Sequence, residues 1–193
     1  MTPAEIKSQL EAAIPGIALK IVRESLLVEN PADLPKAAEF LKNSELRMDY
    51  LSSITGADYL KYLESVYHFY SMEKKSGPVV LRVRTNRETP KIPSLVSLYR
   101  SAEFQEREAY DMFGIIYEGH PDLRRIFMWD NFQGFPLRKD YQQEDSETLE
   151  ADDVEWLEKH NIKVPDGMKQ KAAALKAEGK RAIAKRPTDE EEA

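Results

Sequence analysis

Three consecutive strand candidates between residues 46 and 84 constrain the fold of this chain more than any other feature. Apolar residues occupy alternate positions from residue 46, in a strand expected to run on to Thr55, and again over 79–83. Between them, residues 66–70 are β-branched or aromatic almost throughout, as is typical of a strand. Turn-forming residues over 74–78 join the last two candidates. The three segments therefore predict a largely antiparallel sheet.

Helical patterns precede these strands. Residues Thr2 to Glu5 have the form of a capping box, and the apolar spacing beyond them predicts a helix that ends at Pro15. A second helix is predicted to open at Asp33. Between the two helices, the short apolar segments 17–21 and 26–28 predict a hairpin.

A third helix is predicted over 102–113, after the strands. Ser101 is its expected N-cap, and Gly114 is the expected left-handed residue that closes it. The segment 115–117 is predicted to be extended. Helices segregated on one side of a mainly antiparallel or mixed sheet make an α+β fold. Here we expect that fold to be followed by an irregular partner-binding segment and a C-terminal extension.

Composition excludes several kinds of chemistry. The sequence contains no cysteine, which removes disulfides, thiolate nucleophiles and cysteine-ligated zinc or iron–sulfur clusters. Its histidines, His68, His120 and His160, are widely spaced and do not favour a metal site. Residues 1–141 carry 19 basic and 20 acidic residues, whereas nucleic acid binding needs a basic face. We therefore expect neither a metal nor nucleic acid.

No apolar run approaches the ~20 residues that a membrane-spanning helix needs. The charged residues Glu5, Lys7 and Glu11 also interrupt any signal-peptide pattern. Any membrane association is therefore expected to be indirect.

The densest pattern in the chain lies between residues 106 and 141. It comprises Glu-Arg-Glu at 106–108, Tyr-Asp-Met-Phe-Gly-Ile at 110–115, Gly-His-Pro-Asp-Leu-Arg-Arg-Ile at 119–126 and Gly-Phe-Pro-Leu-Arg-Lys-Asp-Tyr at 134–141. At this spacing the four blocks closely resemble the C-type subunit of proton-pumping NADH:quinone oxidoreductase, which is the 30 kDa subunit family of respiratory complex I.

The resemblance implies a non-catalytic structural subunit of the hydrophilic arm, with no cofactor of its own. Such a protein would brace the quinone-pocket subunit (the 49 kDa type) and adjoin iron–sulfur subunits during electron transfer from NADH to quinone coupled to proton translocation. The assembled enzyme would use NADH, FMN, iron–sulfur clusters and quinone. The implied location is peripheral, on the cytoplasmic face of a bacterial cell membrane.

The resemblance also implies which residues meet the partner subunits. Arginines of the blocks are suited to bind carboxylates in bidentate fashion. The expected partner-binding residues are Glu106, Arg107, Glu108, Asp111, His120, Pro121, Arg124, Arg125, Phe135, Arg138, Lys139 and Tyr141. The expected domains are an α+β domain over 1–113, a motif segment over 114–141 that packs on the body and the partner, and a charged extension over 142–193.

Other interpretations stay open. Each charged residue taken singly also fits a solvated helix face, on which Arg107 would pair with Glu103 and Asp111 for only ~0.3–0.5 kcal/mol each. The same scaffold could serve a membrane-bound hydrogenase or a ferredoxin-dependent quinone reductase. A soluble enzyme could instead use Asp111 and His120 as an acid–base pair. A free-standing acidic adaptor working through its tail is a further alternative.

Residues 142–193 differ in composition from the rest. They hold 14 acidic and 9 basic residues and few large apolar ones, a composition that favours order only on assembly. A short helix is predicted around Val154, Trp156 and Leu157, and alanines favour another over 170–185.

Overall fold

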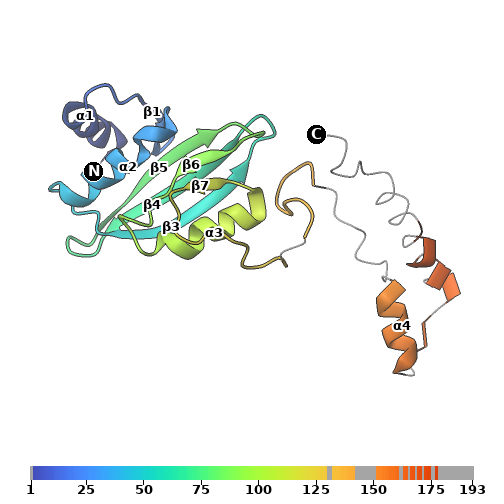
Figure 1. The fold of residues 1–193 in the computed structure, drawn as a ribbon. Coiled ribbons are helices and arrows are strands. Elements are labelled where there is room, and N and C mark those ends of the chain that lie inside the picture. The colour runs from blue at the N-terminus through green and yellow to red at the C-terminus, as the bar shows by residue number, and fades with distance from the viewer. Residues whose placement is uncertain are drawn as a thin grey trace, which may run out of the picture. The chain divides into compact units, whose positions relative to one another are not determined.

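The computed structural model describes residues 2–129, 132–141 and 151–160, together with 163–164, 166–167, 169–170, 172–174 and 177. Internal contacts divide the chain into two compact units, Met1–Tyr141 and Gln142–Ala193. Figure 1 shows the elements of both units along the chain.

The first unit is built on a five-stranded sheet with the order β1-β2-β5-β4-β3. Its strands are β1 (Leu19–Val22), β2 (Ser25–Val28), β3 (Tyr50–Asp58), β4 (Leu63–Ser71) and β5 (Ser76–Thr85). All neighbouring strands pair antiparallel except β2 and β5, which are parallel. The sheet is therefore mixed, and the predicted α+β class is confirmed.

Three helices accompany this sheet: α1 (Pro3–Ala13), α2 (Leu34–Asn43) and α3 (Ala102–Phe113). A 3-10 turn, Pro31–Asp33, leads into α2. The predicted capping box of α1 is present, with Thr2 and Glu5 bonding to each other's backbone N–H groups. The predicted extended segment after α3 is β7 (Ile116–Glu118), which pairs in parallel with β6 (Lys91–Pro93), a strand that the sequence pattern did not predict.

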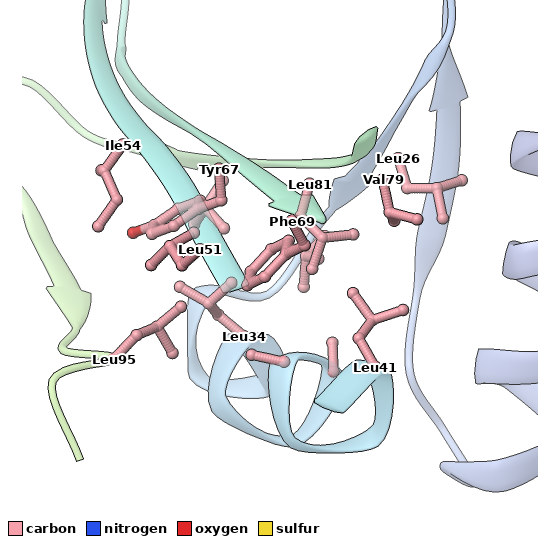
Figure 2. Packing of buried hydrophobic residues seen from close by; sticks show 14 of the residues in the cluster. Leu26, Leu34, Leu41, Leu51, Ile54, Tyr67, Phe69, Val79, Leu81 and Leu95 are labelled. Atoms are coloured by element: carbon pink, nitrogen blue, oxygen red, sulfur yellow. The ribbon is translucent and has the colours of Figure 1, made fainter. Parts of the chain in front are cut away.

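One face of the sheet and all three helices share a single hydrophobic core. Figure 2 shows Leu34 and Leu41 of α2 packed beneath Tyr67 and Phe69 of β4. These four side chains are fully buried, as is Leu10 of α1. Burial of apolar surface on this face stabilises the domain and fixes α3 against β3.

The strand predicted from residue 46 begins four residues later than expected. Leu46 and Met48 are buried, as their alternation suggested, but they lie in the connection from α2 to β3. The N–H of Met48 bonds to the carbonyl of Leu41 at 2.9 Å, so the chain is still following α2 there. Tyr50, the third residue of this alternation, is 44% exposed, and pairing with β4 begins there.

Helix α3 has the predicted bounds and Ser101 occupies its N-cap position, but the expected side-chain capping bond is absent. Ser101 has right-handed helical φ and ψ of −63° and −18°, and its side chain makes no capping bond. Its hydroxyl donates instead to the carbonyl of Leu51 in the edge strand β3, at 2.9 Å. Nearby, Gln105 accepts the N–H of Ile54 at 2.5 Å. The first turn of α3 therefore satisfies backbone groups on the free edge of β3.

Close packing of α3 on β3 depends on Gly56. A Cβ at this position would lie 2.4 Å from Cδ2 of Phe113 in the last turn of the helix. The ring can occupy this place only because the strand has no side chain there.

The opposite face of the sheet carries Arg82 and Arg84 of β5. Both donate to Glu64 of β4, over 2.6 and 2.8 Å, and the Glu64 side chain is buried beneath them. Arg82 and Arg84 are therefore both paired with an acidic residue of the neighbouring strand.

The second unit contains α4 (Ala151–Lys159), which includes the residues of the predicted short helix. Most of the helix favoured over 170–185 lies outside the described residues. Within the described parts of the chain, none of the helices combines the length and apolar character required to cross a membrane.

Candidate functional site

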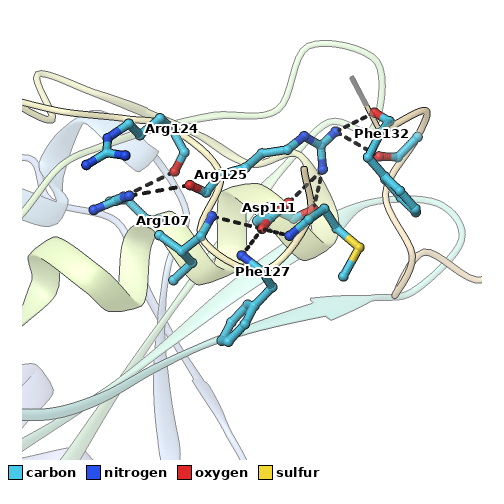
Figure 3. Close-up of polar contacts among 9 residues, drawn as sticks. Arg107, Asp111, Arg124, Arg125, Phe127 and Phe132 are labelled. Atoms are coloured by element: carbon cyan, nitrogen blue, oxygen red, sulfur yellow. Dashed lines mark hydrogen bonds and ion pairs between the residues drawn. The ribbon is translucent and has the colours of Figure 1, made fainter. Parts of the chain in front are cut away.

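Asp111, in the last turns of α3, is the buried centre of the segment that follows this helix. Its Oδ2 accepts backbone N–H bonds from Ile126, Phe127 and Met128 at 3.0, 2.7 and 2.9 Å. Its Oδ1 accepts Nη1 of Arg125 at 2.7 Å (Figure 3). Residues 125–128 therefore fold back onto α3 and are held there by hydrogen bonds to one carboxylate.

These donors determine the ionisation of Asp111. Burial by itself would raise the pKa of the carboxyl, but the backbone N–H groups of Met128 and Phe127 and the Arg125 guanidinium outweigh burial. The pKa of Asp111 therefore lies below its usual value. The charged form is the one that the fold uses.

Arg125 extends the same network into the later part of the segment. Its Nη2 donates to the carbonyl oxygens of Phe132 and Gly134 at 3.3 and 3.0 Å. The guanidinium also lies over the rings of Phe132 and Phe135, 5.6 and 5.3 Å from their centroids. One arginine thus joins the end of α3 to residues 132–135.

Arg107 does not belong to an exposed row of charges. It is only 5% exposed, and its guanidinium donates to the carbonyls of Arg124 and Arg125 at 3.1 and 3.4 Å. The pairs predicted with Glu103 and Asp111 were wrong, because the returning chain covers this face and presents carbonyls that need donors. Asp111 is bound to Arg125 instead.

His120 fastens the start of the segment. Its Nδ1 accepts the N–H of Asp122 at 3.0 Å, so its Nε2 carries the proton and donates to the Glu103 carbonyl at 2.9 Å. Asp122 pairs in turn with Arg124 at 2.8 Å. His120 and Asp111, the candidates for an acid–base pair, are thus each bonded to other groups.

Glu106 is buried on the side of α3 that faces the loop after β6. Its two carboxyl oxygens accept the N–H of Leu95 at 2.7 Å and the hydroxyl of Ser94 at 2.6 Å. Burial raises the pKa of Glu106 to about 7, against the opposing effect of these two hydrogen bonds. Glu106 therefore ties α3 to the preceding loop.

Gly114 ends α3 with φ of 74°, as predicted. Phe135 and Arg138 pack directly on it: a Cβ there would lie 2.5 Å from two ring atoms of Phe135 and 2.8 Å from Nη2 of Arg138. Arg138 also donates to the Phe113 carbonyl at 2.6 Å. The segment can approach the helix end this closely because the position has no side chain.

Asp58 is a second buried centre, which the sequence pattern did not reveal. Its carboxylate accepts the N–H groups of Leu60 and Lys139 at 2.7 and 2.8 Å and also binds Arg87, which reaches Asp140 as well. Burial would raise the pKa of Asp58, but the bonds from Arg87 and the two N–H groups lower it to about 2. Asp58 and Lys139 are 81 residues apart, so no local pattern could reveal the contact.

Other expected site residues lie nearer the surface. Tyr141 is half-buried and stacks on Phe132 with 5.9 Å between ring centroids. The exposed members are Glu108, Pro121, Arg124 and Lys139. Among the described residues, no group of three or more acidic or histidine side chains is placed to hold a metal ion.

Fold and site together define a class of protein: an α+β domain whose last helix uses buried charged side chains to fix the segment that follows it. Residues 27–147 match the family described as respiratory-chain NADH dehydrogenase, 30 Kd subunit. The chain belongs to this family.

Individual relatives agree with that membership. The C 2 subunit of NADH-quinone oxidoreductase from Rhizobium meliloti (strain 1021) is 44% identical over 115 residues, which are 58% of this chain and 62% of that protein. The C subunit from Roseiflexus sp. (strain RS-1) is 40% identical over 144 residues, covering 71% of this chain and 82% of that protein. The chain thus spans less than two thirds of the length of the first relative.

A solved structure shares the fold. A chain of the membrane-bound sulfane sulfur reductase, an archaeal respiratory membrane complex, matches with a TM-score of 0.58 and 24% identity. The match covers 82% of this chain and 91% of that chain.

Proposed function

We propose that this chain is the 30 kDa-type structural subunit in the hydrophilic arm of an NADH:quinone oxidoreductase. The observation that carries the proposal is the Asp111 network, which folds the four blocks of residues 106–141 into one internally bonded segment. The names of the relatives supply the assembly in which such a segment would work.

In this proposal the motif residues divide their work. Glu106, Arg107, Asp111 and Arg125 support the segment from inside, since their side-chain donors and acceptors bind this chain's own backbone. The exposed residues Glu108, Pro121, Arg124 and Lys139, with the edge of Tyr141, face the partners. The partners would be the quinone-pocket subunit and the adjacent iron–sulfur subunits.

The contribution of such a protein to the reaction is geometric. NADH, FMN, iron–sulfur clusters and quinone would be bound by other subunits, and this chain would hold the quinone-pocket subunit in place during electron transfer and proton translocation. A site supported by rigid elements keeps its geometry better than one supported by loops, and the Asp111 network bonds the segment to the helix α3. Attachment to the cytoplasmic face of the membrane would come through these partners.

Purification of the tagged full-length chain from membranes in mild detergent tests the proposal. The expected result is co-purification of the quinone-pocket subunit and the NADH-oxidising flavoprotein, identified by mass spectrometry, with NADH:quinone reductase activity. Recovery with a nickel–iron hydrogenase subunit would show that the chain belongs to a membrane-bound hydrogenase instead. Recovery of a lone soluble chain would refute the proposal.

A further inference from the structure

Three large apolar side chains that face solvent have their backbone N–H groups bound to fixed acceptors of the domain. The bonds run from Leu60 to Asp58 at 2.7 Å, from Phe127 to Asp111 at 2.7 Å and from Leu137 to the carbonyl of Met112 at 3.1 Å. The exposed fractions of Leu60, Phe127 and Leu137 are 59%, 60% and 55%. We call these three residues the apolar rim.

The acceptors of these bonds belong to one support. Asp111 and Met112 are consecutive residues of α3, and α3 packs on β3, whose last residue is Asp58. Asp58 also binds the N–H of Lys139, two residues after Leu137. The hairpin between β3 and β4 and the segment after α3 are therefore held by the same part of the fold.

The backbone of Leu60 is held in a conformation that leucine rarely adopts. Its φ is 65°, in the left-handed region, where a side chain with a Cβ is disfavoured. The bond from Asp58 keeps the residue there. Figure 3 shows the ring of Phe127 pointing away from the Asp111 cluster while its N–H points into it. In both residues the backbone is anchored inward and the apolar side chain is presented outward.

Anchoring of the backbone does not bury the three rim side chains within this chain. Anchoring does reduce the conformational entropy that these residues would lose on binding a partner, and this is the main benefit of a preorganised contact residue. We propose that the apolar rim is the docking surface for a partner protein that offers apolar pockets to Leu60, Phe127 and Leu137. This inference rests on the proposed function, because the partner would be a neighbouring subunit of the same complex.

The charges around the rim favour a protein over a lipid surface. Residues 118–141 carry four acidic and four basic residues, and an anionic membrane attracts segments with a clear basic excess. A protein surface, by contrast, can match alternating charges residue by residue. Two residues of the rim, Leu60 and Phe127, lie outside the four motif blocks, so the docking surface extends beyond the motif.

Serine substitutions test the rim in the complete assembly. The tagged full-length chain, as wild type or as Leu60→Ser, Phe127→Ser or Leu137→Ser, would be expressed in cells that lack the native copy and purified in mild detergent. Matched controls are Ile21→Ser in β1 and Met72→Ser in the turn between β4 and β5, which remove apolar side chains that are 44% and 59% exposed. The readout is NADH-oxidising activity recovered per tagged chain.

We expect each rim variant to recover at least about fivefold less activity than wild type, and each control to recover wild-type activity. The purified variants should melt at the wild-type temperature, which shows that the domain itself is intact. If wild type recovers the activity and the rim variants recover as much, the rim is not a docking surface, while the proposed function stands. Equal losses in rim and control variants would also overturn the rim.

Two further outcomes are decisive. If the wild-type chain recovers no NADH-oxidising activity, the proposed function and the rim both fail. Sedimentation of the purified chain with phosphatidylcholine–phosphatidylglycerol vesicles tests the other occupant, and we expect no binding. Vesicle binding by wild type that the rim variants lose would replace the partner protein with a lipid surface.

Discussion

Nη1 of Arg125 donates to both the side chain and the backbone of Asp111, at 2.7 Å to Oδ1 and 3.2 Å to the carbonyl oxygen. The second bond satisfies one of the carbonyls that an α-helix leaves free in its last turn, where a cation is favoured by the helix dipole. Arg125 thus compensates the buried charge of Asp111 and caps α3 with the same atom. Loss of either partner should therefore affect the helix end and the following segment together.

Replacement of Asp111 by asparagine should destabilise the first unit strongly. Asp111→Asn leaves the Arg125 guanidinium without its anion and gives three N–H donors a weaker, neutral acceptor. Breaking one partner of a buried ion pair costs about 3–5 kcal/mol, and we expect a loss in this range from urea unfolding. Glu108→Gln, on the exposed side of the same helix, should change stability by less than about 0.5 kcal/mol. Equal stability of the two variants would contradict the role given to Asp111.

Two glycines with similar backbone angles should respond differently to alanine. Gly114 and Gly119 have φ of 74° and 86°, but a Cβ at Gly114 meets Phe135 and Arg138, whereas a Cβ at Gly119 meets nothing within 4 Å. Gly119→Ala should cost about 1 kcal/mol of backbone strain. Gly114→Ala should cost about 2–4 kcal/mol, because overpacking adds to the strain. Urea unfolding compares the two, and similar losses would show that the segment can move off the helix end.

Glu106 should make the domain less stable as pH rises toward neutrality. Its pKa is raised from 4.5 to about 7 in the fold, so the unfolded chain ionises first and gains stability relative to the native state. The stabilising contribution is complete below pH 4.5 and is lost between about 4.5 and 7. Glu106→Gln keeps an acceptor for Leu95 and removes the titration.

The test is the free energy of unfolding at about pH 5 and pH 8. The wild-type value should fall by on the order of 2–3 kcal/mol more than that of Glu106→Gln. The exposed Glu108→Gln serves as control and should follow the wild-type curve. If the wild-type and Glu106→Gln curves run parallel, the carboxyl is not neutral in the native state near pH 6.

Asp58 should protect two amides that are distant in sequence. Asp58→Asn would weaken the bonds to the N–H groups of Leu60 and Lys139 together, because one carboxylate accepts both. Native-state hydrogen exchange should quicken at both amides by at least about tenfold. The amide of Phe127, which is bound to Asp111, serves as the internal control and should keep its rate. Faster exchange at Leu60 alone would separate the hairpin from the segment.

The features that the sequence predicted correctly are those set by neighbouring residues. The capping box of α1 and the left-handed Gly114 depend on four or five successive positions, and both are present. Strand alternation found the buried face of β5 for the same reason.

The features that the sequence did not predict depend on contacts between residues that are distant in the sequence. Ser101 has the right chemistry for a cap, but Leu51 of the neighbouring strand offers its hydroxyl another acceptor. Arg107 looks solvated on an isolated helix, and only the returning chain at Arg124 covers it. Asp58 has no motif of its own, since its role is defined by Lys139. In each case tertiary contact overrode a local preference.

The contacts of Ser101 and Gln105 with β3 limit how this domain can assemble. An added strand at that edge would need the carbonyl of Leu51 and the N–H of Ile54, and both are already bonded within the chain. β-augmentation at β3 would require removing the start of α3 first. A neighbour on this side would therefore have to recognise side chains, and the same two bonds make this part of the edge unavailable for sheet-to-sheet aggregation.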